Sequence, residues 1–175
     1  MNLPNKLTLG RIFLVPFIIV FLVVGEKVPN YTAGAIFLVA VLTDWLDGRI
    51  ARNTRQVTAL GKLLDPIADK LLISTALIAL VQVGRAPAWM VVLIVGRELA
   101  ITGLRAVAAS QSIIIHASDF GKYKMLAEVA AVTFLILDWP PEWGFIAIPS
   151  LGFLCLWAAI VLSVVSGIDY FLKFW

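Results

Sequence analysis

Long apolar runs alternate along the chain with short segments rich in glycine, proline and polar residues. Because about 20 mostly apolar residues suffice for one membrane-spanning helix, each run is a candidate span. The segments between the runs contain helix breakers such as Pro29 and Gly84, which mark where the helices end. The pattern predicts six transmembrane helices, near residues 10–26, 31–53, 58–84, 87–110, 119–138 and 148–173.

The first eight residues follow a different pattern. At helical spacing Leu3 and Leu7 share one side, whereas the polar Asn5 and Lys6 face the other way. A short helix with one apolar and one charged face typically lies in the membrane interface. Met1 to Thr8 is therefore expected to form a short N-terminal interfacial amphipathic segment.

The composition supports a membrane environment for the whole chain. Hydrophobic residues make up 61% of the sequence and charged residues only 14%, whereas a soluble domain carries about 25% charged residues. A length of 175 residues is ordinary for one domain. We therefore predict an all-α membrane protein with a single domain covering residues 1–175.

The basic residues indicate how the chain crosses the membrane. If the N-terminus is cytoplasmic, every Lys and Arg except Lys27 and Arg85 falls in the cytoplasmic half. The positive-inside rule then favours cytoplasmic N- and C-termini. This excess of positive charge suits anionic headgroups and phosphorylated substrates. Binding to nucleic acid is disfavoured, because the basic residues are interleaved with membrane helices and form no free stripe.

Four aspartates interrupt the second and third predicted helices. Acids inside a membrane are expensive and therefore indicate function. Asp44 and Asp47 are three residues apart and Asp65 and Asp69 four apart, so each pair lies on one helical face. Two neighbouring helices could thus bring four carboxylates together. One alternative is that these acids only line a polar helix bundle or pair with nearby arginines.

Four clustered carboxylates repel one another unless cations neutralise them. Zinc and serine-triad chemistry are excluded, because the chain has a single histidine, His116, and a single cysteine, Cys155. Oxygen ligands alone favour hard cations such as Mg²⁺ or Mn²⁺ over zinc. Four carboxylates suit a pair of divalent cations that clamp a phosphoryl group.

Small residues and one arginine share the face of the aspartates. Gly48 and Ala51 follow Asp44 by four and seven residues, and Gly61 precedes Asp65 by four, which leaves room for a substrate. Arg52 extends this face by one turn and can bind phosphate through two parallel hydrogen bonds. The complete run is Asp44-x2-Asp47-Gly48-x2-Ala51-Arg52-x8-Gly61-x3-Asp65-x3-Asp69.

This run resembles the signature of the CDP-alcohol phosphotransferase family at each of its eight positions. The resemblance implies that Asp44, Asp47, Asp65 and Asp69 hold two divalent cations and that Asp69 is also the general base. It implies a CDP-activated lipid as donor and a homodimeric assembly. The positions that would contact the CDP-lipid are Asn5, Thr8, Gly48, Ala51, Arg52, Thr58 and Gly61. Thr58 could instead be a helix cap.

The rest of the chain resembles the branch of this family that takes CDP-diacylglycerol as donor and sn-glycerol 3-phosphate as acceptor. The matching pieces include Gly96-Arg97-Glu98, Leu104-Arg105 and Gly121-Lys122-Tyr123-Lys124. Four cations would bind the acceptor phosphate, namely Arg97, Arg105, Lys122 and Lys124. Arg97 could instead form a structural ion pair with Glu98. The sequence departs from the branch at Glu128, where glutamine is frequent, so another acceptor such as an inositol phosphate stays open.

A small ion or proton transporter is the alternative from another class, since acids within a membrane also mark translocation paths. Transporters commonly show broken helices or inverted repeats. We find neither pattern in the sequence. Because the chain opens without a transit-like extension, we expect a bacterial inner membrane, with the active site facing the cytoplasm.

Overall fold

The structure is a computed structural model, and it describes residues 3–24, 30–54, 59–111, 119–137 and 148–174. All regular secondary structure in these ranges is helical. The chain divides into two compact units, Met1–Arg85 with Ile136–Asp138, and Ala86–Leu135 with Trp139–Trp175. The single domain over residues 1–175 stays a prediction.

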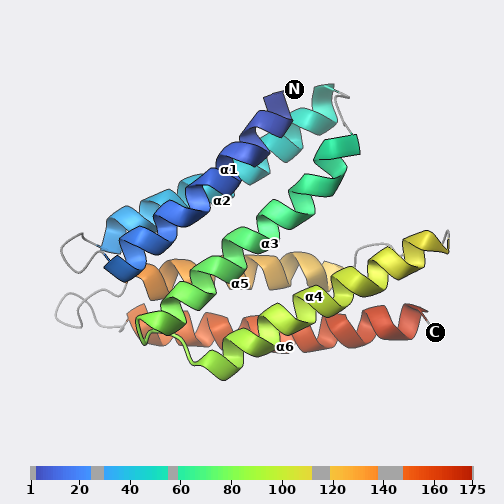
Figure 1. The fold of residues 1–175 in the computed structure, drawn as a ribbon. Helices are drawn as coiled ribbons and strands as arrows, with labels where there is room; N and C mark the ends of the chain where they lie inside the picture. Colours follow the sequence, from blue (N-terminus) through green and yellow to red (C-terminus); the bar gives the residue numbers. More distant parts are fainter. Residues whose placement is uncertain (1–2, 25–29, 55–58, 112–118, 138–147, 175) are drawn as a thin grey trace. The chain divides into compact units, whose positions relative to one another are not determined.

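The first unit contains α1 (Leu3–Ile19), the π-helix η1 (Val20–Val24), α2 (Asn30–Thr54) and α3 (Ala59–Gln82). Helix α1 packs against both α2 and α3 (Figure 1). Several alanines of α2 and α3, among them Ala33, Ala40, Ala68 and Ala76, are fully or almost fully buried. Small residues let helix backbones approach closely, so buried alanines at these positions favour close packing of the helices.

The end of α3 is fixed by a glycine. Gly84 has a φ of 73°, a left-handed conformation that only glycine adopts without strain. The Arg85 N–H donates to the Leu80 carbonyl at 2.8 Å, and the Gly84 N–H donates to the Val81 carbonyl at 3.0 Å. These two bonds satisfy carbonyls at the helix end and stop the helix.

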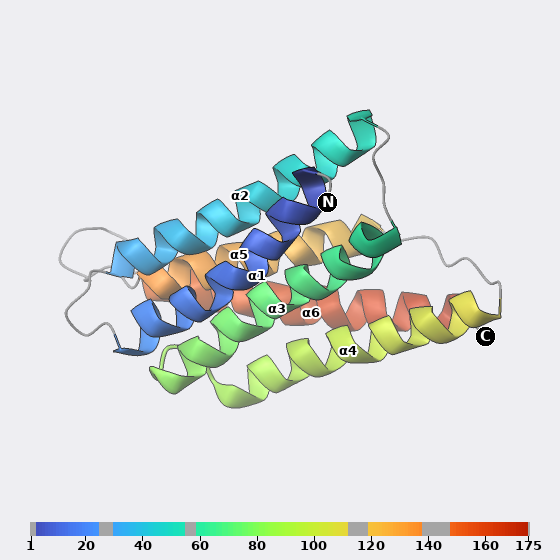
Figure 2. The ribbon, with the colours of Figure 1, turned by 45° about the horizontal axis from the view of Figure 1, so that its top comes forward.

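The second unit contains α4 (Ala88–Ser110), most of α5 (Asp119–Leu137) and α6 (Ile148–Phe174). Helices α4 and α6 pack against each other, as Figure 2 shows. The rings of Trp89 and Trp157 meet edge to face, with their centroids 5.6 Å apart. A Cβ atom on Gly152 would lie 2.8 Å from the Leu135 side chain, so α6 approaches α5 closely at this point.

The predicted helices are confirmed in number within the described residues, and the bounds of all but the first agree closely, since α1 begins at Leu3 and the first predicted helix near residue 10. The fourth predicted helix, for example, covers residues 87–110, and α4 covers Ala88–Ser110. The N-terminal segment is not separate, because α1 starts at Leu3 and continues through Thr8 without a break. Its position in the interface stays a prediction.

Only some of the six predicted membrane spans meet the length and hydropathy expected of a transmembrane helix. Within the described residues one segment, Leu151–Leu172, is long and apolar enough to cross a membrane. Two shorter apolar segments are Thr8–Val23 and Tyr31–Thr43. The six-span arrangement therefore stays a prediction, and the all-helical architecture is confirmed for the described ranges.

Candidate functional site

The four aspartates lie on two uninterrupted helices of the first unit. Asp44 and Asp47 are on α2, and Asp65 and Asp69 are on α3. A regular helix places residues three or four apart on the same face, so each pair shares a face. The side chains of residues 44–54 and 59–66 lie outside the described part of the structure, as does the whole of Thr58. Those predicted contacts are therefore not tested.

Two polar side chains of α1 are buried in the first unit. Thr8, predicted to contact the donor, and Arg11 are each only 1% exposed. Both take part in interactions with other residues. Burying a guanidinium requires compensation by partners, so a buried arginine on the helix that packs against α2 and α3 indicates a functional position. Arg11 had no predicted role in the site. The only sequence feature that could have indicated it is its spacing of three residues from Thr8, which places both on one helical face.

The four cations predicted to bind the acceptor differ in accessibility. Arg105 on α4 and Lys122 on α5 are exposed, whereas Arg97 is half-buried and Lys124 is only 6% exposed. The structure thus separates the set into two accessible and two inward-facing cations. The inward-facing pair has well-defined partners.

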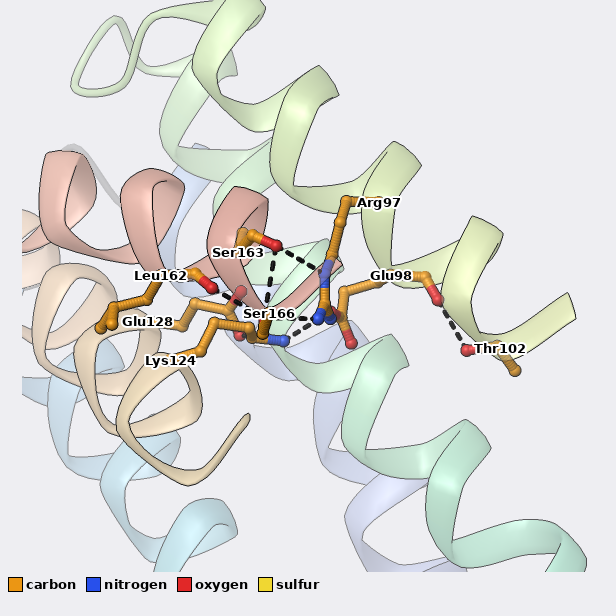
Figure 3. A network of polar contacts seen from close by, with 8 residues as sticks. All are labelled: Arg97, Glu98, Thr102, Lys124, Glu128, Leu162, Ser163 and Ser166. Atoms are coloured by element: carbon orange, nitrogen blue, oxygen red, sulfur yellow. Dashed lines mark hydrogen bonds and ion pairs between the residues drawn. The ribbon is translucent and has the colours of Figure 1, made fainter. Parts of the chain in front are cut away.

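Arg97, Glu98, Lys124 and Glu128 form what we call the ion cluster of the second unit (Figure 3). One carboxylate oxygen of Glu98, Oε1, accepts hydrogen bonds from Arg97 Nη1 and from Lys124 Nζ, each at 2.5 Å. Lys124 Nζ also lies 3.2 Å from Glu128 Oε2, one turn along the same helix. Two positive and two negative side chains thus balance within the cluster.

Arg97 also ties α4 to α6. Its Nε donates to the Ser163 carbonyl at 3.0 Å, and its Nη2 donates to the Ser166 hydroxyl at 2.6 Å. The guanidinium passes beside Gly167, where an added Cβ would lie 3.7 Å from Arg97 Nε. The small residues of α6 therefore accept a planar, multiply hydrogen-bonded arginine, a geometry that lysine does not reproduce.

The ion pair of Arg97 with Glu98, foreseen as an alternative to acceptor binding, is present. Glu128, Ser163 and Ser166 had no predicted role. Lys124 and Glu128 are four residues apart, which is the ordinary spacing of an ion pair on one helix and could have revealed it. The two serines gave no such signal, because their partner comes from another helix.

Comparisons with known proteins cover almost the whole chain. The sequence model of the family described as CDP-alcohol phosphatidyltransferase matches residues 1–165. The CDP-diacylglycerol–glycerol-3-phosphate 3-phosphatidyltransferase of Bacillus subtilis is 47% identical over 186 residues, covering 99% of this chain and 95% of that relative. The protein of the same name from Rickettsia felis is 35% identical, covering 97% of this chain and 93% of its own length.

A third relative gives the same picture. The probable phosphatidylglycerophosphate synthase of Mycobacterium tuberculosis is 40% identical over 172 residues, covering 97% of this chain and 79% of that protein. The family match spans the aspartate-bearing helices α2 and α3 as well as the cluster-bearing helices α4 and α5. The chain belongs to the CDP-alcohol phosphatidyltransferase family.

Proposed function

We propose that the protein transfers the phosphatidyl group of CDP-diacylglycerol to sn-glycerol 3-phosphate, which releases CMP and forms phosphatidylglycerophosphate. The observation that carries the proposal is the 47% identity, over 99% of the chain, to a relative named for this reaction. The uninterrupted helices that carry the aspartates support it. Neither feature is explained by an ion or proton transporter.

The carboxylates of Asp44, Asp47, Asp65 and Asp69 would hold two divalent cations, Mg²⁺ or Mn²⁺. The donor set fits these ions, because it consists of oxygen atoms alone and its acids share helical faces on α2 and α3. When bound, the cations would neutralise the diphosphate of the donor and the charge that develops on the leaving CMP.

The donor would contact residues on α1, α2 and α3 and in the segment that joins α2 to α3. Arg52 would bind a phosphate through two parallel hydrogen bonds, and the small residues near it would admit the nucleotide. Thr8 fits a role beside the donor because it is buried on α1, which packs against both aspartate-bearing helices. The complete set of donor contacts is Asn5, Thr8, Gly48, Ala51, Arg52, Thr58 and Gly61.

Asp69 would act as the general base. A hydroxyl oxygen of the acceptor attacks the β-phosphorus of the donor, and the bond from that phosphorus to the CMP oxygen breaks. The hydroxyl proton passes to the Asp69 carboxylate as the new bond forms. Two features support this role: Asp69 is half-buried on α3, and it follows Asp65 by one helical turn.

Arg105 and Lys122 would supply the accessible positive charge for the acceptor phosphate, because both are exposed on the second unit. Lys124 would add one further donor, and Arg97 would contribute mainly by fixing α4 against α6. We further propose six membrane spans, a homodimer and an active site that faces the cytoplasm. The excess of Lys and Arg in the segments assigned to that side supports this orientation.

An acceptor screen tests the proposal. Purified protein is supplied with CDP-diacylglycerol, Mg²⁺ and one acceptor at a time, and CMP release and the lipid product are measured. We expect turnover with sn-glycerol 3-phosphate and little with inositol 1-phosphate, glycerol or serine. Preferential turnover with inositol 1-phosphate would keep the reaction type but overturn the acceptor. An absence of CMP release with every acceptor would overturn the enzyme assignment.

A further inference from the structure

Lys124 is held from two helices at once. An ammonium group has three N–H donors. Glu98 on α4 and Glu128 on α5 engage two of them, at 2.5 Å and 3.2 Å (Figure 3). Contacts among the described residues thus leave one donor of Lys124 for another oxygen. The direction of that donor is set by the two carboxylates.

The two carboxylates do not play the same part. Glu128 is on the same helix as Lys124 and holds only this cation among the described residues. Glu98 comes from a different helix and contacts Arg97 as well as Lys124. Because Arg97 is itself bound to the Ser163 carbonyl and the Ser166 hydroxyl, the carboxylate of Glu98 is supported through α6. Glu98 is the member of the cluster that connects Lys124 to a fixed framework.

The exposure of the side chains shows which side of the cluster is more open. The Lys124 and Glu128 side chains are 7% and 4% exposed, whereas those of Arg97 and Glu98 are 15% and 17% exposed. A long lysine side chain loses much conformational freedom when it is fixed in one geometry. Fixing Lys124 in the protein beforehand reduces the entropy that a bound anion would otherwise have to remove.

We infer that Glu98 is a positioning residue for acceptor binding, which orients the ammonium of Lys124 so that its remaining N–H donates to the acceptor phosphate. The inference rests on the proposed function, since it concerns the phosphate of the same acceptor. Glu98 itself does not touch the substrate. It acts through Lys124, and Arg97 acts by holding Glu98 in place.

The direction in which the affinity for the acceptor changes, when the charge of Glu98 is removed, distinguishes a positioning role from an electrostatic or a folding role. A carboxylate close to a phosphate repels it, so if Glu98 mattered only through its charge, removing that charge would strengthen acceptor binding. If Glu98 orients Lys124, removing the charge weakens binding instead. If Glu98 serves only folding, the affinity of the folded enzyme for the acceptor does not change.

The experiment measures steady-state CMP release by Glu98→Gln with sn-glycerol 3-phosphate and CDP-diacylglycerol varied in turn. We expect the KM for glycerol 3-phosphate to rise about 10-fold, the lower end of what one lost hydrogen bond to a charged group produces. The KM for the donor should stay within about twofold. Thr133→Val is the matched control, because it removes a hydroxyl of α5 that bonds to the Val129 carbonyl within the helix. It should leave both KM values unchanged.

A second variant covers the possibility that Glu98→Gln does not fold. Glu98→Asp keeps the charge but withdraws the carboxylate by one methylene group. Positioning predicts a raised KM for glycerol 3-phosphate here too, whereas a purely electrostatic role predicts no change. In a Lys124→Met background neither Glu98 substitution should raise this KM further, because the residue through which Glu98 acts is gone.

Three results would overturn the inference, and each differs from a failure of the proposed function. They are a lower KM for glycerol 3-phosphate in Glu98→Gln, an unchanged KM in both Glu98 variants, or an undiminished effect of Glu98 in the Lys124→Met background. If the unsubstituted enzyme released no CMP with glycerol 3-phosphate, the proposed function would fail before any variant was made. Normal turnover of the unsubstituted enzyme with any of the three results would reject only the role of Glu98.

Discussion

Acidic residues in both units have a charged residue one helical turn away, but the sign of that residue differs. In the first unit it is another acid, and in the second it is a cation. On α2 and α3 each acid has another acid three or four residues away, as with Asp65 and Asp69. On α5, Glu128 has a cation four residues away, Lys124, and the two form an ion pair. Like charges on one face repel and require a partner from elsewhere, whereas opposite charges satisfy each other.

This difference suggests different roles for the two groups of acids. The cluster of Arg97, Glu98, Lys124 and Glu128 balances its own charge and needs no added ion. The four aspartates, by contrast, are suited to added divalent cations and therefore to phosphoryl chemistry. Acids on apolar helices are accordingly not equivalent signals of catalysis. Each aspartate has a second acid one turn away on its own helix, whereas Glu128 has the cation Lys124 at that distance.

The largest predicted effect comes from the aspartate helices. Asp65→Asn should reduce kcat/KM about 10³-fold or more, because a lost metal ligand removes several kcal/mol of transition-state stabilisation. The same is expected of Asp44→Asn and Asp47→Asn, and all three proteins should remain folded. CMP release together with thermal unfolding in detergent measures both properties. Near-normal kcat/KM in a folded Asp65→Asn enzyme would contradict the proposal that the aspartates, unlike the acids of the ion cluster, hold catalytic cations.

Asp69→Asn tests whether Asp69 differs from the other three aspartates in acting as a general base. If Asp69 is the general base, the variant should still bind CDP-diacylglycerol while kcat falls by roughly 10²–10⁴-fold. Titration with Mg²⁺ or Mn²⁺ should not restore the rate, because the missing function is proton removal. Substantial rescue by added metal would instead identify Asp69 as a metal ligand only.

In the ion cluster the main effect should be on stability. Lys124→Met leaves the buried Glu128 carboxylate without its cation, and breaking a buried pair in this way costs about 3–5 kcal/mol of unfolding free energy. The double variant Lys124→Met/Glu128→Leu should recover most of the loss, because both charges are then absent. Denaturant unfolding in detergent micelles measures each value. A double variant no more stable than Lys124→Met would show that the pair does not act as a unit.

A smaller effect is expected where the second unit is packed through a glycine. Gly152→Ala would place a Cβ 2.8 Å from the Leu135 side chain and 3.2 Å from the Leu135 backbone nitrogen. Such overpacking should lower the unfolding free energy by about 1–3 kcal/mol. Gly103→Ala is the control, since nothing lies within 4 Å of its added Cβ, and it should stabilise α4 by up to about 1 kcal/mol. Equal stability of the two variants would contradict the close approach of α5 and α6.

The helices could be predicted from the sequence because the lengths of apolar runs set them directly. The start of α1 could not, because Met1 to Thr8 looks like a separate amphipathic segment, set off by Gly10 from the apolar run that follows, although α1 continues through Gly10. Pro16 lies inside α1, and the helix passes into the π-helical turn Val20–Val24, which apolar periodicity does not reveal.

The candidate site was predictable only where its spacing lies within one helix. Each aspartate pair is three or four residues apart, so the shared face follows from helix geometry alone. Ser163 and Ser166, by contrast, read as ordinary small residues of an apolar helix. Their role depends on how α4 and α6 pack and therefore on tertiary contacts with Arg97. A sequence pattern within one helix carries no such information.

The central claim is that divalent cations on the aspartates drive phosphatidyl transfer, while the ion cluster requires none. The most direct test measures CMP release from CDP-diacylglycerol and sn-glycerol 3-phosphate by the purified enzyme before EDTA, after EDTA and after added Mg²⁺. We predict that EDTA stops CMP release, that Mg²⁺ restores it, and that the helical content stays constant throughout. CMP release that continued at its full rate in EDTA would contradict the account.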